Sequence, residues 1–112
     1  MMKRGEIWFA DLSPTVGSEI NKRRPVVIVS NNANNRAAST VTVLPITSNV
    51  DKIYPFEVAL PIEASGLPKA SKAQAQQIRT IARERIVGKR CGQMDKKTMD
   101  AIDHAIRLHL AL

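Results

Sequence analysis

Two short polar stretches of this sequence combine phosphate-binding side chains with a backbone that restricts their position. In the first, a run of cations ends with Arg24, which directly precedes Pro25. Proline keeps the preceding residue extended, and the planar guanidinium of arginine can form two parallel hydrogen bonds with a phosphate. The second is the cluster Thr47-Ser48-Asn49, which follows a strand-like segment. Phosphate binding is one interpretation of these stretches; solvated loop cations and a hydroxyl-rich turn are the alternatives.

Other common catalytic arrangements find little support in the sequence. The acidic residues are scattered singly, and neither an HExxH motif nor a zinc-type Cys/His spacing occurs. His104 and His109 lie on a predicted helix, at a spacing that separates them by roughly 140° around its axis. Cys91 has no base beside it in the sequence and is expected to be a small core residue. We therefore predict a site that uses no metal ion and no other cofactor.

The charge distribution favours a polyanionic partner. Lys and Arg number 17 against 10 Asp and Glu, which gives a net charge of +7 and a pI near 10.1. Residues 94–112 carry three cations and three carboxylates, so the whole excess lies in residues 1–93. Such a surplus is typical of proteins that meet phosphate backbones. Solubility, or attachment to a ribosome or a membrane surface, would explain the surplus equally well.

Length and composition predict one domain, residues 1–112. A chain of 112 residues, of which 44% are hydrophobic, can build one core. The single cysteine leaves no internal disulfide to form and fits a reducing cytosol. No apolar run reaches the length of a signal-peptide core or the roughly 18 residues that span a membrane. We expect a cytoplasmic protein with no membrane contact.

The elements that must position the two polar stretches are mostly β-strands. Short β-branched or alternating segments, separated by turn residues, predict a small antiparallel barrel or sandwich. The expected strands are residues 6–12, 25–29, 40–46, 54–60, 72–81 and 84–91. The polar segment 15–24 is expected to be a mobile loop. Residues 31–38 are compatible with one or two helical turns, and helix is the alternative for residues 73–77.

The sequence also predicts where individual strand residues lie relative to the core and to the sheet edge. Residues 25–29 form a continuous apolar run, which indicates a strand buried on both faces at the centre of the core. Pro45 cannot donate a backbone hydrogen bond, so it indicates an edge or a bulge in its strand. Trp8 is expected in the core.

The last segment changes its period and predicts a docked amphipathic helix over residues 95–110. Asp95 is a suitable N-cap residue. Apolar residues then recur at spacings of three or four, at Met99, Ile102, Ile106 and Leu110. This stripe is expected to pack against the strands.

Five blocks of sequence follow one another over nearly the whole chain. They are KRGEIWFADLSPTVGSE at 3–19, RRPVVIVSN at 23–31, PITSN at 45–49, YPFEV at 54–58 and QIRTI at 77–81. In this order they resemble the MazF/PemK family of toxin-antitoxin toxins. The resemblance implies a homodimer of SH3-like antiparallel β-barrels, with helices added to a mainly β fold. It also implies sequence-selective cleavage of single-stranded RNA such as mRNA, and inhibition by a cognate antitoxin protein.

The resemblance further implies roles for individual residues. The family's catalytic arginine falls on Arg24, its catalytic threonine on Thr47, and the acidic residue of its GSE loop on Glu19. The sequence departs from members that use an aspartate soon after a glycine turn, because residues 65–76 contain no acid. Lys72 stands in that stretch and is expected to add a cation that alters the preferred RNA sequence.

The implied reaction draws its nucleophile, the 2′-hydroxyl, from the RNA itself. The protein must align this group, stabilise charge on the phosphate oxygens and assist proton transfer. Arg24 keeps its proton at neutral pH, so it suits charge stabilisation better than the role of a base. Thr47 would hold the phosphate or the 2′-hydroxyl, and Glu19 is the candidate base. The expected products are a 2′,3′-cyclic phosphate and a 5′-hydroxyl.

Further side chains are predicted to bind RNA. Tyr54 and Phe56 can stack on unpaired bases, although their alternation in a strand is equally compatible with burial. Polar side chains that can reach base edges are Ser48, Asn49 and Gln77. Cations that can contact phosphates are Lys22, Arg23, Lys72 and Arg79.

Two other classes of function fit the charge and the small β fold. One is a non-catalytic nucleic-acid-binding module. The other is a protein-targeting toxin, since gyrase-poisoning toxins resemble this fold. The combination of Arg24 with Thr47 favours RNA cleavage over both.

Overall fold

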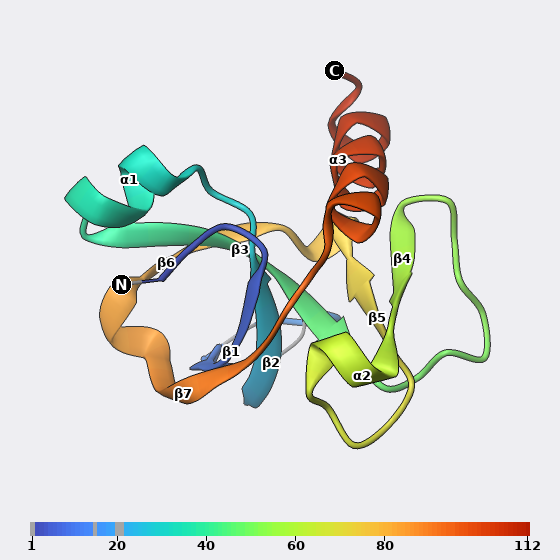
Figure 1. The fold of residues 1–112 in the computed structure, drawn as a ribbon, viewed down its shortest axis with the longest axis horizontal. Helices are drawn as coiled ribbons and strands as arrows, with labels where there is room; N and C mark the ends of the chain where they lie inside the picture. The colour runs from blue at the N-terminus through green and yellow to red at the C-terminus, as the bar shows by residue number, and fades with distance from the viewer. Residues whose placement is uncertain (1, 15, 20–21) are drawn as a thin grey trace.

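The computed structural model describes residues 2–14, 16–19 and 22–112, and over these ranges the chain is mainly antiparallel sheet (Figure 1). The strands are β1 (Glu6–Asp11), β2 (Arg23–Ile28), β3 (Thr40–Thr47), β4 (Glu57–Leu60), β5 (Ser71–Gln74), β6 (Arg79–Ala82) and β7 (Ile86–Gln93). The helices are α1 (Asn32–Ala37), α2 (Ile62–Ser65) and α3 (Lys96–Leu110), with 3-10 turns η1 (Ala75–Gln77) and η2 (Arg83–Arg85). None of the helices in these ranges has both the length and the apolar character needed to span a bilayer.

The strands pair in the order β4-β5-β3-β2-β1-β7, and β6 joins the sheet through β3. β3 changes partner along its length: residues 40–43 pair with β6, and residues 46 and 47 pair with β5. In Figure 1, α1 and β6 therefore lie at one side of the molecule, and β4 and β5 at the other. The predicted antiparallel fold with a C-terminal helix is confirmed. The sheet stays open between β4 and β7, so the strand pairing does not close a complete barrel.

Pro45 lies within a central strand, so its assignment to an edge or a bulge is wrong. On one side it is paired with Val26 of β2, and its side chain is fully buried. On the other side the pairing passes from Val43 with Arg79 to Ile46 with Ala73. Pro45 thus falls where β3 changes partner, and the missing N–H of proline interrupts neither of these two ladders.

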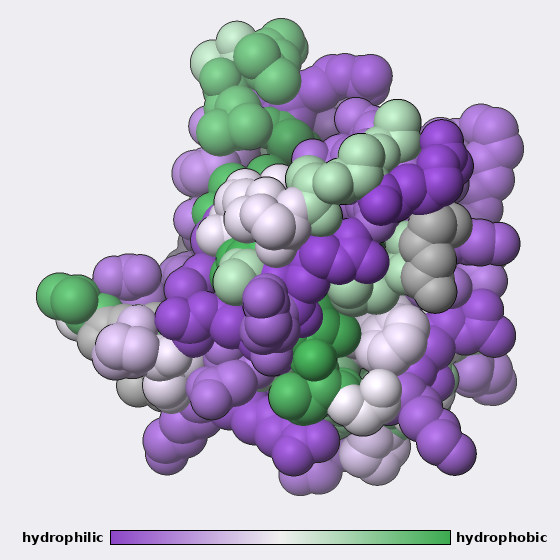
Figure 2. Space-filling model, turned by 90° about the vertical axis from the view of Figure 1, so that its left-hand side faces the viewer, coloured by the Kyte–Doolittle hydropathy of each residue, from purple (hydrophilic) through white to green (hydrophobic). Residues whose placement is uncertain are grey.

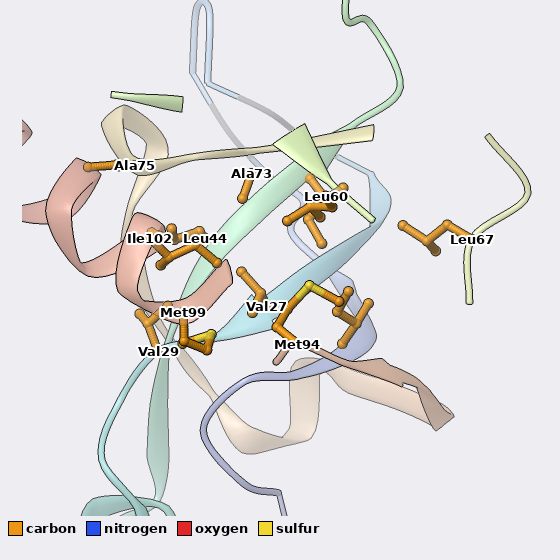
Figure 3. Packing of buried hydrophobic residues seen from close by; sticks show 13 residues of the cluster. Val27, Val29, Leu44, Leu60, Leu67, Ala73, Ala75, Met94, Met99 and Ile102 are labelled. Atoms are coloured by element: carbon orange, nitrogen blue, oxygen red, sulfur yellow. The ribbon is translucent and has the colours of Figure 1, made fainter. Parts of the chain in front are cut away.

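β2 is buried on both faces, as its continuous apolar run predicts. Val27 belongs to the cluster that packs beneath α3, together with Met99 and Ile102 (Figure 3). Val26 and Ile28 face the opposite way, into a second cluster. Each such fully buried side chain stabilises the fold by about 1.5–3 kcal/mol. β2 therefore holds the two cores together.

α3 begins where predicted, because the Asp95 side chain accepts a hydrogen bond from the backbone N–H of Thr98 at 2.8 Å. Met99 and Ile102 are buried against the sheet, whereas Leu110 is 46% exposed. The packing predicted for Leu110 is wrong, since the last turns of the helix extend beyond the sheet (Figure 1). The helix is thus anchored by its first half.

Other elements differ from the predictions in extent. The expected strand 54–60 begins only at Glu57, and the preceding residues form a turn. The expected strand 72–81 is divided into β5 and β6 by η1, so the strand and helical-turn interpretations each hold for part of it. α2 was not predicted. The predicted loop 15–24 includes positions 15, 20 and 21, which lie outside the described residues.

α2 packs against β7 through two glycines. A Cβ atom added to Gly92 would lie 2.1 Å from the carbonyl oxygen of Ala64. One added to Gly66, whose φ is +69°, would lie 1.9 Å from the carbonyl oxygen of Cys91. Only glycine allows the two backbones to approach this closely.

Cys91 itself is half-buried against the core beneath α3, and Trp8 is half-buried against the second cluster.

Candidate active site

The register between β2 and β3 brings Arg24 and Thr47 to the same end of the sheet. Val26 pairs with Pro45, and the pairing continues through residues 27 and 28. Extending this register by two residues places Arg24 opposite Thr47. Arg24 lies near the start of β2 and Thr47 is the last residue of β3, and both are half-buried. Two residues more than twenty positions apart in the sequence thereby come to the same end of the sheet.

A pocket of about 260 Å³ lies at this end of the sheet. Arg24 and Ser48 contribute to its polar part. The other lining residues are Phe9, Pro25, Ile46, Leu67, Pro68, Lys69 and Ser71. A larger hollow of about 580 Å³ lies between α1 and α3, but none of the predicted site residues lines it. Only the smaller pocket therefore coincides with the predicted chemistry.

The Thr47-Ser48-Asn49 cluster forms a turn at the end of β3. Thr47 Oγ1 accepts a hydrogen bond from the backbone N–H of Asn49 at 3.2 Å. Asn49 Oδ1 accepts another from the N–H of Asp51 at 3.3 Å. Ser48 and Asn49 are exposed. The turn orients the Thr47 oxygen, and the proton of this hydroxyl remains available to a phosphate.

Glu19 lies exposed in the segment between β1 and β2. Its Oε1 accepts a hydrogen bond from the backbone N–H of Val16 at 3.2 Å. This bond closes a short turn that contains Gly17, whose φ is +62°. The carboxylate faces solvent, and Glu19 is not among the residues that line the pocket.

The predicted phosphate-binding cations occupy different environments. Lys22 and Arg23 are exposed. The Arg23 guanidinium carbon lies 5.9 Å from the ring centroid of Phe9, which lines the pocket. Arg79 on β6 is half-buried and donates to the carbonyl of Leu12 at 3.2 Å. Arg23 is therefore the cation placed beside the pocket, while Arg79 also holds the end of β1.

Lys72 is not a free cation, which corrects its predicted place among the phosphate contacts. Its side chain is 8% exposed, and its Nζ donates to Glu57 Oε1 at 2.8 Å and to the carbonyl of Lys52 at 2.6 Å. The amide groups of Gln74 and Gln76 donate to the other oxygen of the Glu57 carboxylate. The ammonium group thus donates its hydrogen bonds within a buried network that connects the β3–β4 segment to β5.

The same network sets the ionisation of Glu57. Burial alone would raise the pKa of this carboxyl group, but the hydrogen bonds outweigh it and lower the pKa to about 2. The main donors are the Lys72 ammonium and the backbone N–H of Tyr54. Glu57 is therefore a structural anion, locked in its charged form.

Tyr54 and Phe56 lie in the turn before β4, so their predicted alternation within a strand is wrong. Their rings stack with centroids 5.3 Å apart and an interplanar angle of 3°. Tyr54 is 41% exposed, and the Lys52 ammonium lies 4.6 Å from its ring centroid. Phe56 is half-buried, with its ring centroid 6.4 Å from that of His109. Tyr54 is the aromatic side chain presented to solvent.

Of the predicted site residues, Arg24 and Ser48 line the pocket, whereas Thr47, Glu19, Asn49 and Gln77 are not among its lining residues. Gln77 is half-buried in η1. His104 and His109 are both exposed on α3. In the ranges that the structure describes, no group of three or more His, Cys, Asp or Glu side chains is arranged to hold a metal ion.

Sequence reasoning missed several pocket residues. Phe9 was grouped with an ordinary strand, and Leu67, Lys69 and Ser71 fell in the stretch 65–76, where Lys72 was the residue singled out. They come from β1 and from the α2–β5 connection, which meet only through the fold. No local pattern identifies such residues, because each is typical of its own segment.

Comparison with known proteins identifies the family. Residues 3–110 match the model of the PemK-like, MazF-like toxin of type II toxin-antitoxin systems. The chain is 46% identical to endoribonuclease MazF9 of Mycobacterium tuberculosis, covering 100% of this chain and 98% of that protein. It is 38% identical to endoribonuclease EndoA of Bacillus subtilis, covering 100% of this chain and 97% of that protein.

Solved structures agree with these sequence matches. A mycobacterial endoribonuclease in complex with its cognate antitoxin superposes with a TM-score of 0.82 at 27% identity, covering 100% of this chain and 97% of the other. MazF of Deinococcus radiodurans superposes with a TM-score of 0.85 at 22% identity, covering 99% and 97%. The second likeness concerns the fold alone. The chain therefore belongs to the family of PemK-like, MazF-like toxins of type II toxin-antitoxin systems.

Proposed function

We propose that this protein is a sequence-selective endoribonuclease that cleaves single-stranded RNA such as mRNA without a metal ion. The observation that carries the proposal is the placement of Arg24 and Thr47 at one end of two paired strands, beside a pocket. Relatives that match the whole chain are named endoribonucleases, which supports the same class of reaction.

The reaction begins with attack of the ribose 2′-oxygen on the adjacent phosphorus. The bond from phosphorus to the 5′-oxygen breaks, and the products are a 2′,3′-cyclic phosphate and a 5′-hydroxyl. The proton of the 2′-hydroxyl passes to a base, and the departing 5′-oxygen acquires a proton. No water is consumed in this step, so the protein must supply alignment and charge stabilisation.

Arg24 stabilises the negative charge on the non-bridging phosphate oxygens. Its half-buried position strengthens this interaction relative to open water. Thr47 donates its hydroxyl proton to the phosphate or aligns the 2′-hydroxyl, with its oxygen oriented by the N–H of Asn49. Glu19 is the carboxylate proposed to take the 2′-hydroxyl proton.

RNA binding draws on the surfaces around this site. Tyr54 presents an exposed ring for a base, backed by Phe56, and such stacks contribute about 1–3 kcal/mol each. Lys22, Arg23 and Arg79 are proposed to contact phosphates without reading the sequence. The side chains proposed to contact base edges are Ser48, Asn49 and Gln77.

We propose an antitoxin protein as the partner that controls this activity. One structural relative was solved with its cognate antitoxin, and the whole charge excess of the present chain lies in residues 1–93. An acidic antitoxin segment and an RNA backbone would both bind the cations at Lys22, Arg23 and Arg24, so the two ligands would compete. The cognate antitoxin should therefore displace single-stranded RNA at fixed salt; unchanged RNA affinity at saturating antitoxin would remove this proposal.

The decisive test is incubation of the purified protein with single-stranded RNA in EDTA. Cleavage should persist, and a 2′-deoxynucleotide 5′ to the scissile phosphate should block it because the nucleophile is deleted. Binding without cleavage would favour a nucleic-acid-binding module instead. Cleavage that survives the 2′-deoxy substitution, or that requires a divalent ion, would show that the mechanism is wrong.

A further inference from the structure

The pocket beside Arg24 has two kinds of lining, which indicates what it binds. Its walls are apolar and come from Phe9, Pro25 and Ile46 on the strands and from Leu67 and Pro68 on the α2–β5 connection. A phosphate has no apolar surface to place against such walls. A flat, weakly polar ring does, because rings stack well on aromatic and proline faces.

The volume of the pocket limits the size of this ring. About 260 Å³ is below the range of roughly 300–1,000 Å³ that is typical of pockets for drug-sized ligands. One nucleobase fits this description better than a dinucleotide. Since Arg24 lines the pocket and is proposed to hold the scissile phosphate, the base belongs to a nucleotide at or next to the cleaved bond.

The polar groups around the pocket determine which bases are accepted. Arg24 and Lys69 are cations that only donate hydrogen bonds. The Ser71 hydroxyl already donates to the carbonyl of Lys69 at 3.0 Å, so it is left with acceptor capacity. Ser48 can donate or accept. With Arg24 assigned to the scissile phosphate, Lys69 is the charged donor proposed for the base, and no carboxylate is among the residues found to line the pocket.

We infer that this pocket is a subsite for one unpaired keto base, uracil or guanine, and that Lys69 is the residue that reads it. Uracil presents carbonyl oxygens, and guanine presents the O6 and N7 acceptors. Adenine and cytosine place an exocyclic amino group, a donor, at the corresponding edge. Lys69 is exposed and reaches the pocket from the α2–β5 connection, outside the catalytic pair. The position of this base relative to the cleaved bond rests on the proposed ribonuclease function, whereas the base preference of the pocket does not.

The test uses a pool of single-stranded RNA of random sequence, cut by the wild-type protein and by Lys69→Ala, with every cut site sequenced. Wild-type cuts should share a uracil or a guanine at one position within two nucleotides of the cleaved bond. Lys69→Ala should lower the preference at that position alone, by roughly tenfold, the value of one hydrogen bond to a charged group. The control Lys97→Ala removes an exposed cation from the first turn of α3 and should leave the preference unchanged.

A second measurement separates the pocket from the reaction. Uridine 3′-monophosphate should shift the amide resonances of Ser48, Leu67 and Lys69 at lower concentration than adenosine 3′-monophosphate does. Lack of RNA cleavage together with such selective binding would refute the proposed function and leave the subsite standing. RNA cleavage whose base preference is the same in Lys69→Ala and in the wild type would overturn the subsite and leave the function standing. An equal loss of rate at every sequence in Lys69→Ala would also overturn it, because that is the behaviour of a phosphate contact.

Discussion

The backbone of Arg24 is held in the sheet by its pairing with β1. Its backbone pairs with Ala10 of β1, and the register with β3 extends toward Thr47. Because its backbone is already fixed, Arg24 loses only side-chain entropy when it binds a phosphate. Arginine is also better suited than lysine to this position, since its planar fork binds two oxygens at once.

Replacing Arg24 or Thr47 by alanine should lower the cleavage rate by roughly a hundredfold to a thousandfold, the usual effect of removing one donor that stabilises a transition state. Single-turnover cleavage of one RNA oligonucleotide measures this effect, and circular dichroism checks that the fold is kept. His104→Ala, which changes an exposed side chain on α3, should remain fully active. Wild-type rates in both Arg24→Ala and Thr47→Ala would refute the proposed site.

The lowered pKa of Glu57 predicts how the stability of the protein depends on pH. Its pKa is about 2 in the fold and near 4.5 when unperturbed, so the folded state favours the charged form. The corresponding stabilisation is fully present above about pH 4.5 and is lost as the pH falls toward 2. Urea denaturation between pH 5 and pH 2 should therefore show a smaller loss of stability in Glu57→Gln than in the wild type. The control Glu84→Gln removes an exposed carboxylate and should follow the wild-type curve.

Individual residues were predicted from the sequence with unequal success. Arg24 beside a proline and Thr47 after a strand are local signals, and the resemblance to a family assigned their roles. Lys72 looked like one more surface cation, because nothing in the sequence says that Glu57, fifteen positions earlier, lies buried beside it. Burial of a charge depends on which strands pair, and that information is not local.

At the scale of elements, the close approach of α2 to β7 depends on having no side chain at Gly92. Ala64 of α2 presents its carbonyl oxygen to this position. The contact links the β4–β5 side of the sheet to the strand at its other end. It therefore contributes to the curvature that brings the α2–β5 connection to the pocket.

Gly92→Ala should destabilise the protein by about 1–3 kcal/mol, because the added Cβ overlaps backbone atoms that must move apart. Chemical denaturation monitored by circular dichroism measures the change. Gly17→Ala is the control, since a Cβ at Gly17 meets no atom within 4 Å and only its φ of +62° is unfavourable. A smaller loss in Gly92→Ala than in Gly17→Ala would contradict the packing described.

The elements that were predicted well are those with a regular period. β2 is a continuous apolar run, and α3 has a capping Asp95 followed by spacings of three and four. The strand expected over residues 54–60 was correct from Glu57 onward and wrong before it, because Tyr54 and Phe56 stack in a turn that precedes β4. α2 is a single short turn of helix, below the length at which a period can be recognised.

At the scale of the molecule, the end of α3 forms an apolar cap. Leu108, Leu110 and Leu112 are 49%, 46% and 84% exposed. Figure 2 shows this cap as the hydrophobic region at the top of a largely hydrophilic face. Several exposed apolar side chains at one end of a molecule indicate an interaction surface. We propose that a second copy of the chain covers them in a homodimer.

Sedimentation at micromolar concentration should give the mass of a dimer, and Leu110→Glu should shift it toward the monomer because a charge would be buried in the interface. The control Ala101→Glu adds the same charge at an exposed position in the first half of α3. A monomeric wild-type protein would refute the dimer. An unaffected dimer in Leu110→Glu would show that the interface lies elsewhere.

Because β2 contributes side chains to both hydrophobic clusters, it cannot detach from one while the other stays intact. Its amide protons should exchange with deuterated water only through complete unfolding, at the slowest rate in the chain. Arg24 stands on this strand, so fraying of loops or helix ends does not remove it from the site. With Arg24 in its proposed catalytic role, local opening would not switch off cleavage, so control would fall to a bound inhibitor such as the proposed antitoxin.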